Sequence, residues 1–267
     1  MKILVLGKQG WLGDIFYNYV KTQGGNITYS DTNINLITSF ASDITHVVNF
    51  AAKANIDWCE SNKNATFYSN VLGAVNLART CKAFDKKYVF LSSGCVFQSA
   101  NSKDIKYEDS VPNPACFYTR TKLMGEQLIK EIIPSSLIVR FRLPLSEVPH
   151  SRNALNKLSS YGKLLITRES AIIVEDAIPL LHELILKNET GDFNLSNAGT
   201  ISPAEIGKAI GNTFEICSKE ELDKEMEKQG RAHRVTTVLG TNRGYNLPPI
   251  QERIEDIVDK WKMLSKK

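Results

Sequence analysis

Four reactive side chains lie in two short stretches of the sequence. Ser93 and Cys95 stand near the end of the apolar run 87–97, which is typical of a buried strand that finishes in small residues. Tyr118 and Lys122 follow, and their spacing of four residues places them one helical turn apart on the same face. A hydroxyl, a thiol, a phenol and an ammonium group could then meet at one carbonyl. This set of groups is sufficient to handle a hydride and a carbon-bound proton.

A tyrosine that protonates a nascent alkoxide needs an available proton near neutral pH, whereas the reference pKa of a phenol is about 10. Lowering that pKa by about three units corresponds to about 4 kcal/mol. A nearby ammonium group and the positive charge of a nicotinamide could supply it together. We expect Lys122 to stabilise the phenolate of Tyr118 and to hold a ribose hydroxyl, and Ser93 to hydrogen-bond the substrate carbonyl. The alternative is a tyrosine and a lysine on the exposed face of an amphipathic helix.

A glycine-rich turn follows the first apolar run, residues 2–6, and leads into a helical pattern. In such a turn Gly7 permits the sharp bend, Gly10 lets the backbone approach a pyrophosphate, and Gly13 lets the helix pack on the strand. The placement indicates dinucleotide binding. The residues expected to hold the cofactor here are Gly7, Lys8, Gln9, Gly10, Trp11, Leu12 and Gly13.

The next apolar run, 26–30, ends at Asp31, where an acid would contact the ribose of NAD. Asp31 is equally typical of a turn residue, and Lys8 could meet a ribose phosphate instead. This part of the sequence therefore leaves the choice between NADH and NADPH open.

Strand and helix patterns alternate along the first half of the chain. Further buried strands are predicted at 46–52, 87–97 and 137–143, with helices at 62–84 and 116–132 and a polar and aromatic loop at 55–60. The first of these strands ends in Asn49, Ala51 and Ala52, small residues whose backbone could lie against a cofactor. Repeated alternation with short connections predicts an α/β fold with a doubly wound parallel sheet of the Rossmann type.

The pattern is looser beyond Pro144. Helices are predicted at 153–161, 174–187 and 250–264 and strands at 164–167 and 192–195, with capping boxes that begin at Ser202 and Ser218. The expected domains are a dinucleotide-binding domain at 1–143, with a return at about 171–196, and a smaller C-terminal substrate-binding lobe formed by 144–170 and 197–267.

Composition narrows the class of protein. The 267 residues are 42% hydrophobic and 23% charged, with a formal net charge of +4, which predicts a globular protein with no nucleic-acid or membrane partner. The first apolar run is too short for a signal peptide or a membrane span, so we expect a cytoplasmic protein. The 5 cysteines have no metal-ligand spacing, which predicts reduced thiols and no metal site.

The motifs together resemble a known superfamily. Gly7, Gly10 and Gly13, Asn49 with Ala51 and Ala52, Ser93, and Tyr118 with Lys122 are similar to the extended short-chain dehydrogenase/reductases. Within that superfamily the chain resembles the nucleotide-sugar reductases, namely the dTDP-4-dehydrorhamnose reductases and the bifunctional 3,5-epimerase/4-reductases of UDP-L-rhamnose synthesis. The second likeness rests on 57–61, 70–73, 94–97, 117–118, 142–146 and 152–157, and it extends through nearly the whole chain.

The resemblance implies two kinds of chemistry on a UDP-4-keto-6-deoxyglucose or its 2-acetamido analogue. Cys95 would remove the C3 and C5 protons and Lys157 would return them on the opposite face. Reduction at C4 would then give UDP-L-rhamnose or its analogue. Free cysteine is only a few per cent thiolate near pH 7, so Cys95 requires activation, for example by nearby cationic groups.

The resemblance also implies a cofactor, substrate contacts and an assembly. NADPH is favoured, although Thr32 or Asn33 stands where the bifunctional members carry an arginine, so NADH stays open. Asn153, Arg231 and Arg234 are candidates to contact the UDP-sugar, and a homodimer would form through the helices at 62–84 and 116–132. Two alternatives remain: a reductase without epimerase activity, and a non-catalytic regulatory binding subunit, because fold alone does not give function.

Overall fold

The structure, a computed structural model, describes residues 1–266 and divides into two compact units. Unit 1 comprises Met1–Val96, Pro114–Arg140 and Ile178–Phe193. Unit 2 comprises Phe97–Asn113, Phe141–Ala177 and Asn194–Lys267. The assignment of cofactor binding to one and substrate binding to the other stays a prediction. Each unit has its own buried apolar cluster.

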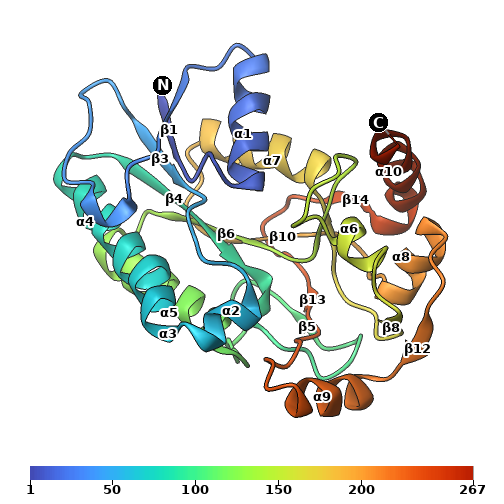
Figure 1. The fold of residues 1–267 in the computed structure, drawn as a ribbon. Coiled ribbons are helices and arrows are strands. Elements are labelled where there is room, and N and C mark those ends of the chain that lie inside the picture. Colours follow the sequence, from blue (N-terminus) through green and yellow to red (C-terminus); the bar gives the residue numbers. More distant parts are fainter. Residues whose placement is uncertain (267) are drawn as a thin grey trace. The chain divides into compact units, whose positions relative to one another are not determined.

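A six-stranded sheet in the order β10-β6-β4-β3-β1-β2 organises unit 1 (Figure 1). Its strands are β1 (Ile3–Leu6), β2 (Ile27–Ser30), β3 (His46–Asn49), β4 (Lys87–Ser93), β6 (Leu137–Phe141) and β10 (Gly191–Leu195). The pairs β1–β2, β1–β3 and β3–β4 are parallel and in register. This order confirms the predicted α/β fold with a doubly wound parallel sheet, because the chain reverses direction across the sheet at β1.

Helices pack on this sheet through their apolar faces. They are α1 (Trp11–Thr22), α4 (Ala74–Ala83), α5 (Phe117–Ile132) and α7 (Val174–Leu186). Two shorter helices, α2 (Ile56–Ser61) and α3 (Lys63–Phe67), lie against α5. Leu77 of α4 and Ile129 of α5 are fully buried in one cluster with Phe90 of β4. Each such side chain contributes about 1.5–3 kcal/mol by leaving water, so α4 and α5 are held firmly against the strand that ends in Ser93.

Three local features differ from the expectation. Residues 55–60 are largely helical as α2, because the Asn55 side chain accepts a hydrogen bond from the Trp58 amide at 3.1 Å and so caps a helix where a loop was predicted. The helix predicted at 62–84 contains a π-helical turn, η2 (Tyr68–Gly73), between α3 and α4. Strand β4 ends at Ser93, and Gly94–Val96 form a 3-10 turn, η3.

Short two-stranded pairs and helices build unit 2. Its elements are β5 (Ile105–Lys106), β7 (Pro144–Leu145), α6 (Ala154–Leu158), β8 (Lys163–Leu165), β9 (Ile172–Ile173), β11 (Asn197–Ala198), α8 (Pro203–Ile210), β12 (Glu215–Cys217), α9 (Lys219–Lys228), β13 (Val238–Leu239), β14 (Leu247–Pro249) and α10 (Ile250–Ser265). The capping boxes predicted at Ser202 and Ser218 are both present.

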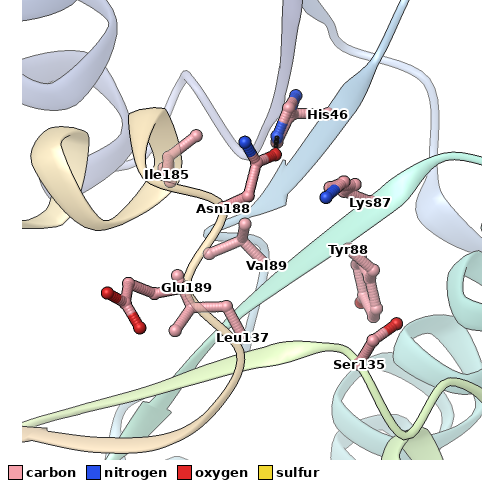
Figure 2. A pocket seen from close by; sticks show the side chains of 9 residues that line it. All are labelled: His46, Lys87, Tyr88, Val89, Ser135, Leu137, Ile185, Asn188 and Glu189. Atoms are coloured by element: carbon pink, nitrogen blue, oxygen red, sulfur yellow. Dashed lines mark hydrogen bonds between the residues drawn. The ribbon is translucent and has the colours of Figure 1, made fainter. Parts of the chain in front are cut away.

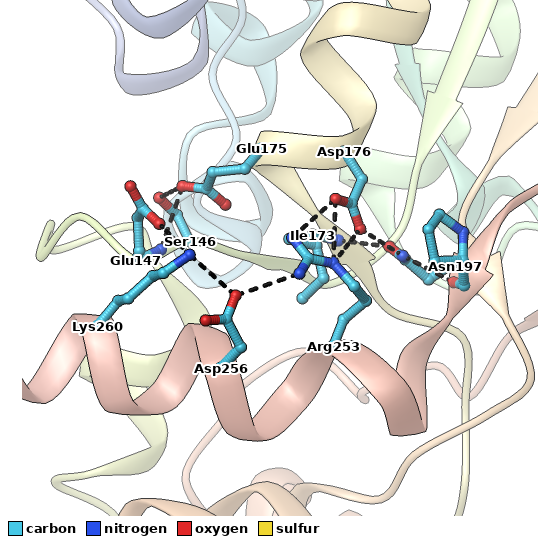
Figure 3. Close-up of polar contacts among 10 residues, drawn as sticks. Ser146, Glu147, Ile173, Glu175, Asp176, Asn197, Arg253, Asp256 and Lys260 are labelled. Atoms are coloured by element: carbon cyan, nitrogen blue, oxygen red, sulfur yellow. Dashed lines mark hydrogen bonds and ion pairs between the residues drawn. The ribbon is translucent and has the colours of Figure 1, made fainter.

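Helix α10 is attached to the rest of unit 2 by charge as well as by its apolar face (Figure 3). Arg253 pairs with Asp176 at 3.0 Å, and the amide of Asn197 donates to the same carboxylate at 2.8 Å. Lys260 pairs with Asp256 on the same helix at 3.0 Å. The Arg253 pair is mostly shielded from water and makes several hydrogen bonds, so it fixes α10 more firmly than an exposed pair would.

In the part of the chain that the structure describes, no helix has the length and apolar character needed to cross a membrane.

Candidate active site

The end of β4 and the start of α5 come together in unit 1. Ser93 is 6% exposed and Cys95 is 8% exposed, and the Cys95 amide donates to the Ser93 hydroxyl at 3.2 Å across the η3 turn. Tyr118, in the first turn of α5, forms a hydrogen bond with the Ser93 side chain. The structure therefore brings together the hydroxyl, the thiol and the phenol that the sequence analysis singled out.

Tyr118 is surrounded by groups that keep its phenol neutral. Burial raises its pKa well above the usual value, the nearby thiol of Cys95 raises it further, and the hydrogen bond with Ser93 lowers it. The spacing of Tyr118 and Lys122 predicted that the ammonium group and the positive charge of a nicotinamide would together lower this pKa. The structure differs because desolvation, which favours the neutral phenol, is the largest effect. The proton of Tyr118 is consequently retained at neutral pH.

Lys122 lies one turn further along α5, as its spacing predicts, and is only 2% exposed. Its Nζ donates to the backbone carbonyl of Leu91 at 2.7 Å and lies 4.0 Å from the centroid of the Phe90 ring. Burial lowers the pKa of Lys122 to about 7, and the charge of Glu126 partly opposes this effect. An ammonium group that titrates near neutral pH can exchange a proton under physiological conditions.

The amino terminus of α5 is fixed by a carboxylate from α2. Glu60 accepts a hydrogen bond from the Phe117 amide, the first residue of the helix. An acidic group is favourable at this end because the amides of the first turn carry partial positive charge. Asn70 of η2 holds the next turn: its amide donates to the Thr121 hydroxyl at 3.3 Å and to the Lys53 carbonyl at 2.9 Å.

The glycine turn between β1 and α1 has the geometry of a phosphate-binding loop. Gly7 has φ +79°, and a Cβ there would lie 2.6 Å from the Ala51 nitrogen. A Cβ on Gly13 would lie 2.3 Å from the Gly7 oxygen. Gly13 is therefore required for the start of α1 to pack against the glycine turn, whereas the sequence predicted that it packs against the strand. Gly10 caps α1 with no side-chain hydrogen bond, so the amides of the first turn can receive an anion.

The remaining predicted cofactor residues line the same end of the sheet. Asn49 is buried, accepts a hydrogen bond from the Ala51 amide at 2.9 Å and donates to the Tyr88 hydroxyl at 2.9 Å. Ala52 follows, Trp11 is buried, Leu12 is half-buried and Gln9 is exposed. Asn49 thus shapes the loop after β3, and the residues present fit a dinucleotide across the carboxyl ends of β1 and β3.

Lys8 stands in the glycine turn with its ammonium group held in place. Its Nζ lies 3.0 Å from Asp14, and 5.5 Å and 5.3 Å from the ring centroids of Tyr17 and Tyr29. The hydrogen bond with Asp14 raises the pKa of Lys8. Tyr29 belongs to β2, so this positive charge is fixed beside the strand after which an adenine ribose is bound in such folds.

Lys157 is placed in α6 of unit 2. Its side chain is exposed, yet the protein crowding its ammonium group lowers its pKa, and the charges of Arg152 and Arg234 lower it further. These three residues form a cationic cluster within the unit. A depressed pKa makes Lys157 a better proton donor near neutral pH.

The three predicted substrate contacts have different surroundings. Asn153 is fully buried, and its amide donates to the backbone carbonyls of Ser146 at 2.7 Å and Val148 at 3.0 Å while it caps α6. Arg231 is exposed, and Arg234 donates to the Ala232 carbonyl at 3.0 Å. The structure gives Asn153 a supporting role in the loop before α6, and all three assignments to substrate stay predictions.

A small cavity at the opposite ends of the strands is separate from these groups. It measures about 10 Å³, enough for one water molecule, and is lined by His46 and Lys87, which begin β3 and β4 (Figure 2). His46 and Asn188 form a hydrogen bond of 3.1 Å there. No group of three or more His, Cys, Asp or Glu residues within 1–266 is arranged to hold a metal ion.

Several supporting residues were missed by the sequence analysis. Glu60, Asn70 and Arg140 hydrogen-bond to residues of α5, and Glu126 of α5 hydrogen-bonds to Ser92 near the end of β4. One signal was available for Arg140, which is a charged residue inside the otherwise apolar run of β6. A buried charge requires a partner, so this position indicates a hidden acid.

The chain also resembles known proteins in sequence. The family model described as the RmlD substrate binding domain matches residues 1–260. A bifunctional dTDP-4-dehydrorhamnose 3,5-epimerase/dTDP-4-dehydrorhamnose reductase of Arabidopsis thaliana is 31% identical over 218 residues, covering 76% of this chain and 72% of that protein. A trifunctional UDP-glucose 4,6-dehydratase/UDP-4-keto-6-deoxy-D-glucose 3,5-epimerase/UDP-4-keto-L-rhamnose-reductase of the same plant is 31% identical over 80% of this chain.

The chain covers only 34% of the trifunctional protein. Among solved structures, the UDP-rhamnose synthase of Acanthamoeba polyphaga mimivirus superposes with a TM-score of 0.86 at 23% identity, covering 97% of this chain and 99% of that chain. This likeness concerns the fold.

Lys122 generates a prediction about stability. Its pKa is lower in the folded chain than in the unfolded chain, so between pH 7 and 9 the unfolded state binds the additional proton and stability rises with pH by up to about 1.4 kcal/mol per pH unit. Lys122→Met removes this contribution. We expect the free energy of unfolding of the variant, minus that of the wild type, to fall by about that amount per pH unit over this range.

Urea unfolding at pH 7, 8 and 9 measures the difference, with Lys82→Met as the control because Lys82 is exposed on α4. A difference between Lys122→Met and wild type that does not change with pH would contradict the prediction.

The glycine turn, the Ser93, Tyr118 and Lys122 set and the match over 260 residues together show that this chain belongs to the RmlD substrate binding domain family.

Proposed function

We propose that this protein is an NADPH-dependent nucleotide-sugar 4-keto reductase that also epimerises C3 and C5 of its substrate. The substrate class is a UDP-4-keto-6-deoxyglucose or its 2-acetamido analogue, and the product is UDP-L-rhamnose or that analogue. The observation that carries the proposal is the hydrogen-bonded pair of Ser93 and Tyr118, with Cys95 in the same turn. The activities named for the Arabidopsis relatives support it.

In the reductase half, Ser93 hydrogen-bonds the C4 carbonyl and Tyr118 donates its proton to the oxygen as it becomes a hydroxyl. A bound nicotinamide supplies the hydride. The raised pKa of Tyr118 keeps its proton in place until negative charge develops on the oxygen. Lys122, buried beside Leu91, contributes a charge that favours the phenolate left behind.

In the epimerase half, the same ketone acidifies the C3 and C5 hydrogens. Cys95 removes one of these protons as thiolate, and Ser93 and Tyr118 stabilise the enolate oxygen. Lys157 returns a proton to the opposite face, so the configuration inverts. Cys95 then gives its proton to solvent and Lys157 takes one from solvent, which restores both groups before the second centre is inverted. The depressed pKa of Lys157 supports its role as the acid. Arg231 and Arg234 are proposed to contact the diphosphate.

Separate variants distinguish the two halves. With UDP-4-keto-6-deoxyglucose and NADPH in D2O, the wild type should form a rhamnose product with deuterium at C3 and C5. Cys95→Ala should lose deuterium incorporation by about 10²-fold or more, and Tyr118→Phe should lose NADPH oxidation by a similar factor while retaining the part of the exchange that Ser93 alone supports. NMR of the product and absorbance of NADPH measure the two rates, and Cys217→Ala is the matched thiol control.

A reductase without epimerase activity would incorporate no deuterium and would be indifferent to Cys95→Ala. If the wild type oxidises no NADPH with either the 4-keto sugar or its epimerised form, the reductase proposal fails as well.

We propose NADPH as the preferred cofactor because Lys8 fixes a positive charge beside β2. Solved structures of similar fold contain NADP in one case and NAD in another, at 19% and 17% identity. A charge-assisted hydrogen bond to a 2′-phosphate contributes about 1.5–3 kcal/mol. Lys8→Ala should therefore raise the KM for NADPH about 10- to 150-fold and leave that for NADH within twofold.

Initial rates with each cofactor measure the ratio, and Lys21→Ala, an exposed lysine at the end of α1 that lies over the same Tyr17 ring, is the control. Equal effects on the two cofactors would contradict the assignment of Lys8.

We propose a homodimer through α3, η2, α4 and α5. Phe67, Leu72, Met124 and Leu128 are between 38% and 45% exposed on these elements. Exposed apolar side chains that gather on one surface are typical of an interaction site. Leu72→Glu and Met124→Glu together should convert a dimer into a monomer of 29.9 kDa. Light scattering after gel filtration measures the mass, Leu186→Glu is the control, and a wild-type monomer would refute the proposal.

A further inference from the structure

A charged network is buried directly behind the candidate active site of unit 1. Glu126 of α5 is fully buried, and Arg140 of β6 is 1% exposed. Their closest approach is 2.6 Å, between Arg140 Nη2 and Glu126 Oε2, and Arg140 Nε lies 3.1 Å and 3.2 Å from the two carboxylate oxygens. This contact of an arginine with both oxygens fixes the orientation of the carboxylate as well as its position.

The same carboxylate reaches the strand that carries the reactive serine. The Ser92 hydroxyl donates to Glu126 Oε1, and Ser92 immediately precedes Ser93 at the end of β4. Glu126 also lies four residues after Lys122, on the same face of α5. One side chain therefore joins the end of β4 to the helix that supplies Tyr118 and Lys122.

Asp192 extends the network from Arg140 back to α5. Arg140 Nη2 also donates to Asp192 of β10 at 2.6 Å, and Lys130, two turns beyond Lys122 on α5, pairs with Asp192 at 3.0 Å. The two acids and two bases balance in charge. Their contacts tie α5 to β4, β6 and β10 at once.

Stability alone is a weak reason for such a network. Burying two ions removes favourable hydration, and well-packed apolar residues of similar volume often serve at least as well. An apolar pair could not hydrogen-bond Ser92 or place negative charge near Lys122. These are the two properties that the proposed reductase site would use.

We propose that Glu126 is a positioning residue, which sets the register of α5 against the end of β4 and maintains the charge of Lys122. The proposal rests on the reductase function proposed above. The groups that face Lys122 are the Leu91 carbonyl and the Phe90 ring of β4 and, on α5 itself, Glu126. Neighbouring η2 contributes the neutral Asn70, and Arg140 of β6 is paired to Glu126.

The effect of Glu126 on Lys122 has a definite sign. Burial lowers the pKa of Lys122 and the negative charge of Glu126 raises it. Removing that charge should move the pKa of Lys122 further down. If the ammonium form is required for reduction, the basic limb of the pH–rate profile should then move to lower pH.

Three variants separate positioning from simple structural support. Glu126→Gln keeps the shape and removes the charge, and we expect kcat for reduction to fall about 10- to 100-fold while the KM for NADPH changes little. The basic limb of its pH–rate profile should also shift to lower pH.

Glu126→Leu with Arg140→Met replaces the pair by apolar groups. We expect this double variant to melt within about 5 °C of wild type and to have the same low kcat as Glu126→Gln. Glu183→Gln, an exposed carboxylate paired to Lys187, is the matched control.

The double variant keeps the proposal testable if Glu126→Gln does not fold. A stable double variant with wild-type kcat, or a Glu126→Gln profile whose basic limb has not moved, would overturn it.

A second readout does not depend on turnover. The pH dependence of urea unfolding for wild type, Lys122→Met, Glu126→Gln and the combined variant gives the coupling between the two charges. A favourable coupling energy between Glu126 and Lys122 below pH 7 that becomes smaller at higher pH would support the proposal that Glu126 maintains the charge of Lys122. The absence of such coupling would refute it. If the wild type reduces no 4-keto sugar, the proposed function fails while this coupling still tests the role of Glu126.

Discussion

An ammonium group that leaves water loses hydration worth roughly several kcal/mol, and Lys122 holds such a group at 2% exposure. The protein offers it the Leu91 carbonyl, the face of the Phe90 ring and the nearby charge of Glu126. These groups only partly replace the lost hydration, as the lowered pKa of about 7 shows. The contacts that fix α5 also keep this group in place.

Helix α5 is accordingly held by contacts in three successive turns. Glu60 binds the amide of its first residue, Asn70 binds Thr121 in the second turn, and Glu126 connects the third turn to Ser92. Each contact comes from a different element, so the helix cannot slide or rotate without breaking one. The buried Gly125 allows this close approach, since a Cβ there would lie 3.2 Å from the Phe90 ring and 3.3 Å from the Asn70 oxygen.

The sequence was sufficient for features set by local rules. The glycine turn after β1 requires a positive φ at Gly7, and the spacing of Tyr118 and Lys122 follows from helical periodicity, so both were predictable. The helix at 56–61 was missed because it depends on a cap at Asn55 in a segment of weak apolar pattern. The pairing of Glu126 with Arg140 joins residues from a helix and the following strand, and no local pattern specifies which buried charges meet.

In the turn after β4, the position of the Ser93 hydroxyl does not depend on the Cys95 thiol. Cys95 supports Ser93 through its backbone amide, and the thiol takes no part in that bond. The orientation of Ser93 is therefore set by the conformation of the 3-10 turn, which most residues can adopt. The thiol at position 95 can then be replaced with little effect on the orientation of Ser93. The sheet and α5 place Ser93, Tyr118 and Lys122, and the side chain at position 95 takes no part in that placement.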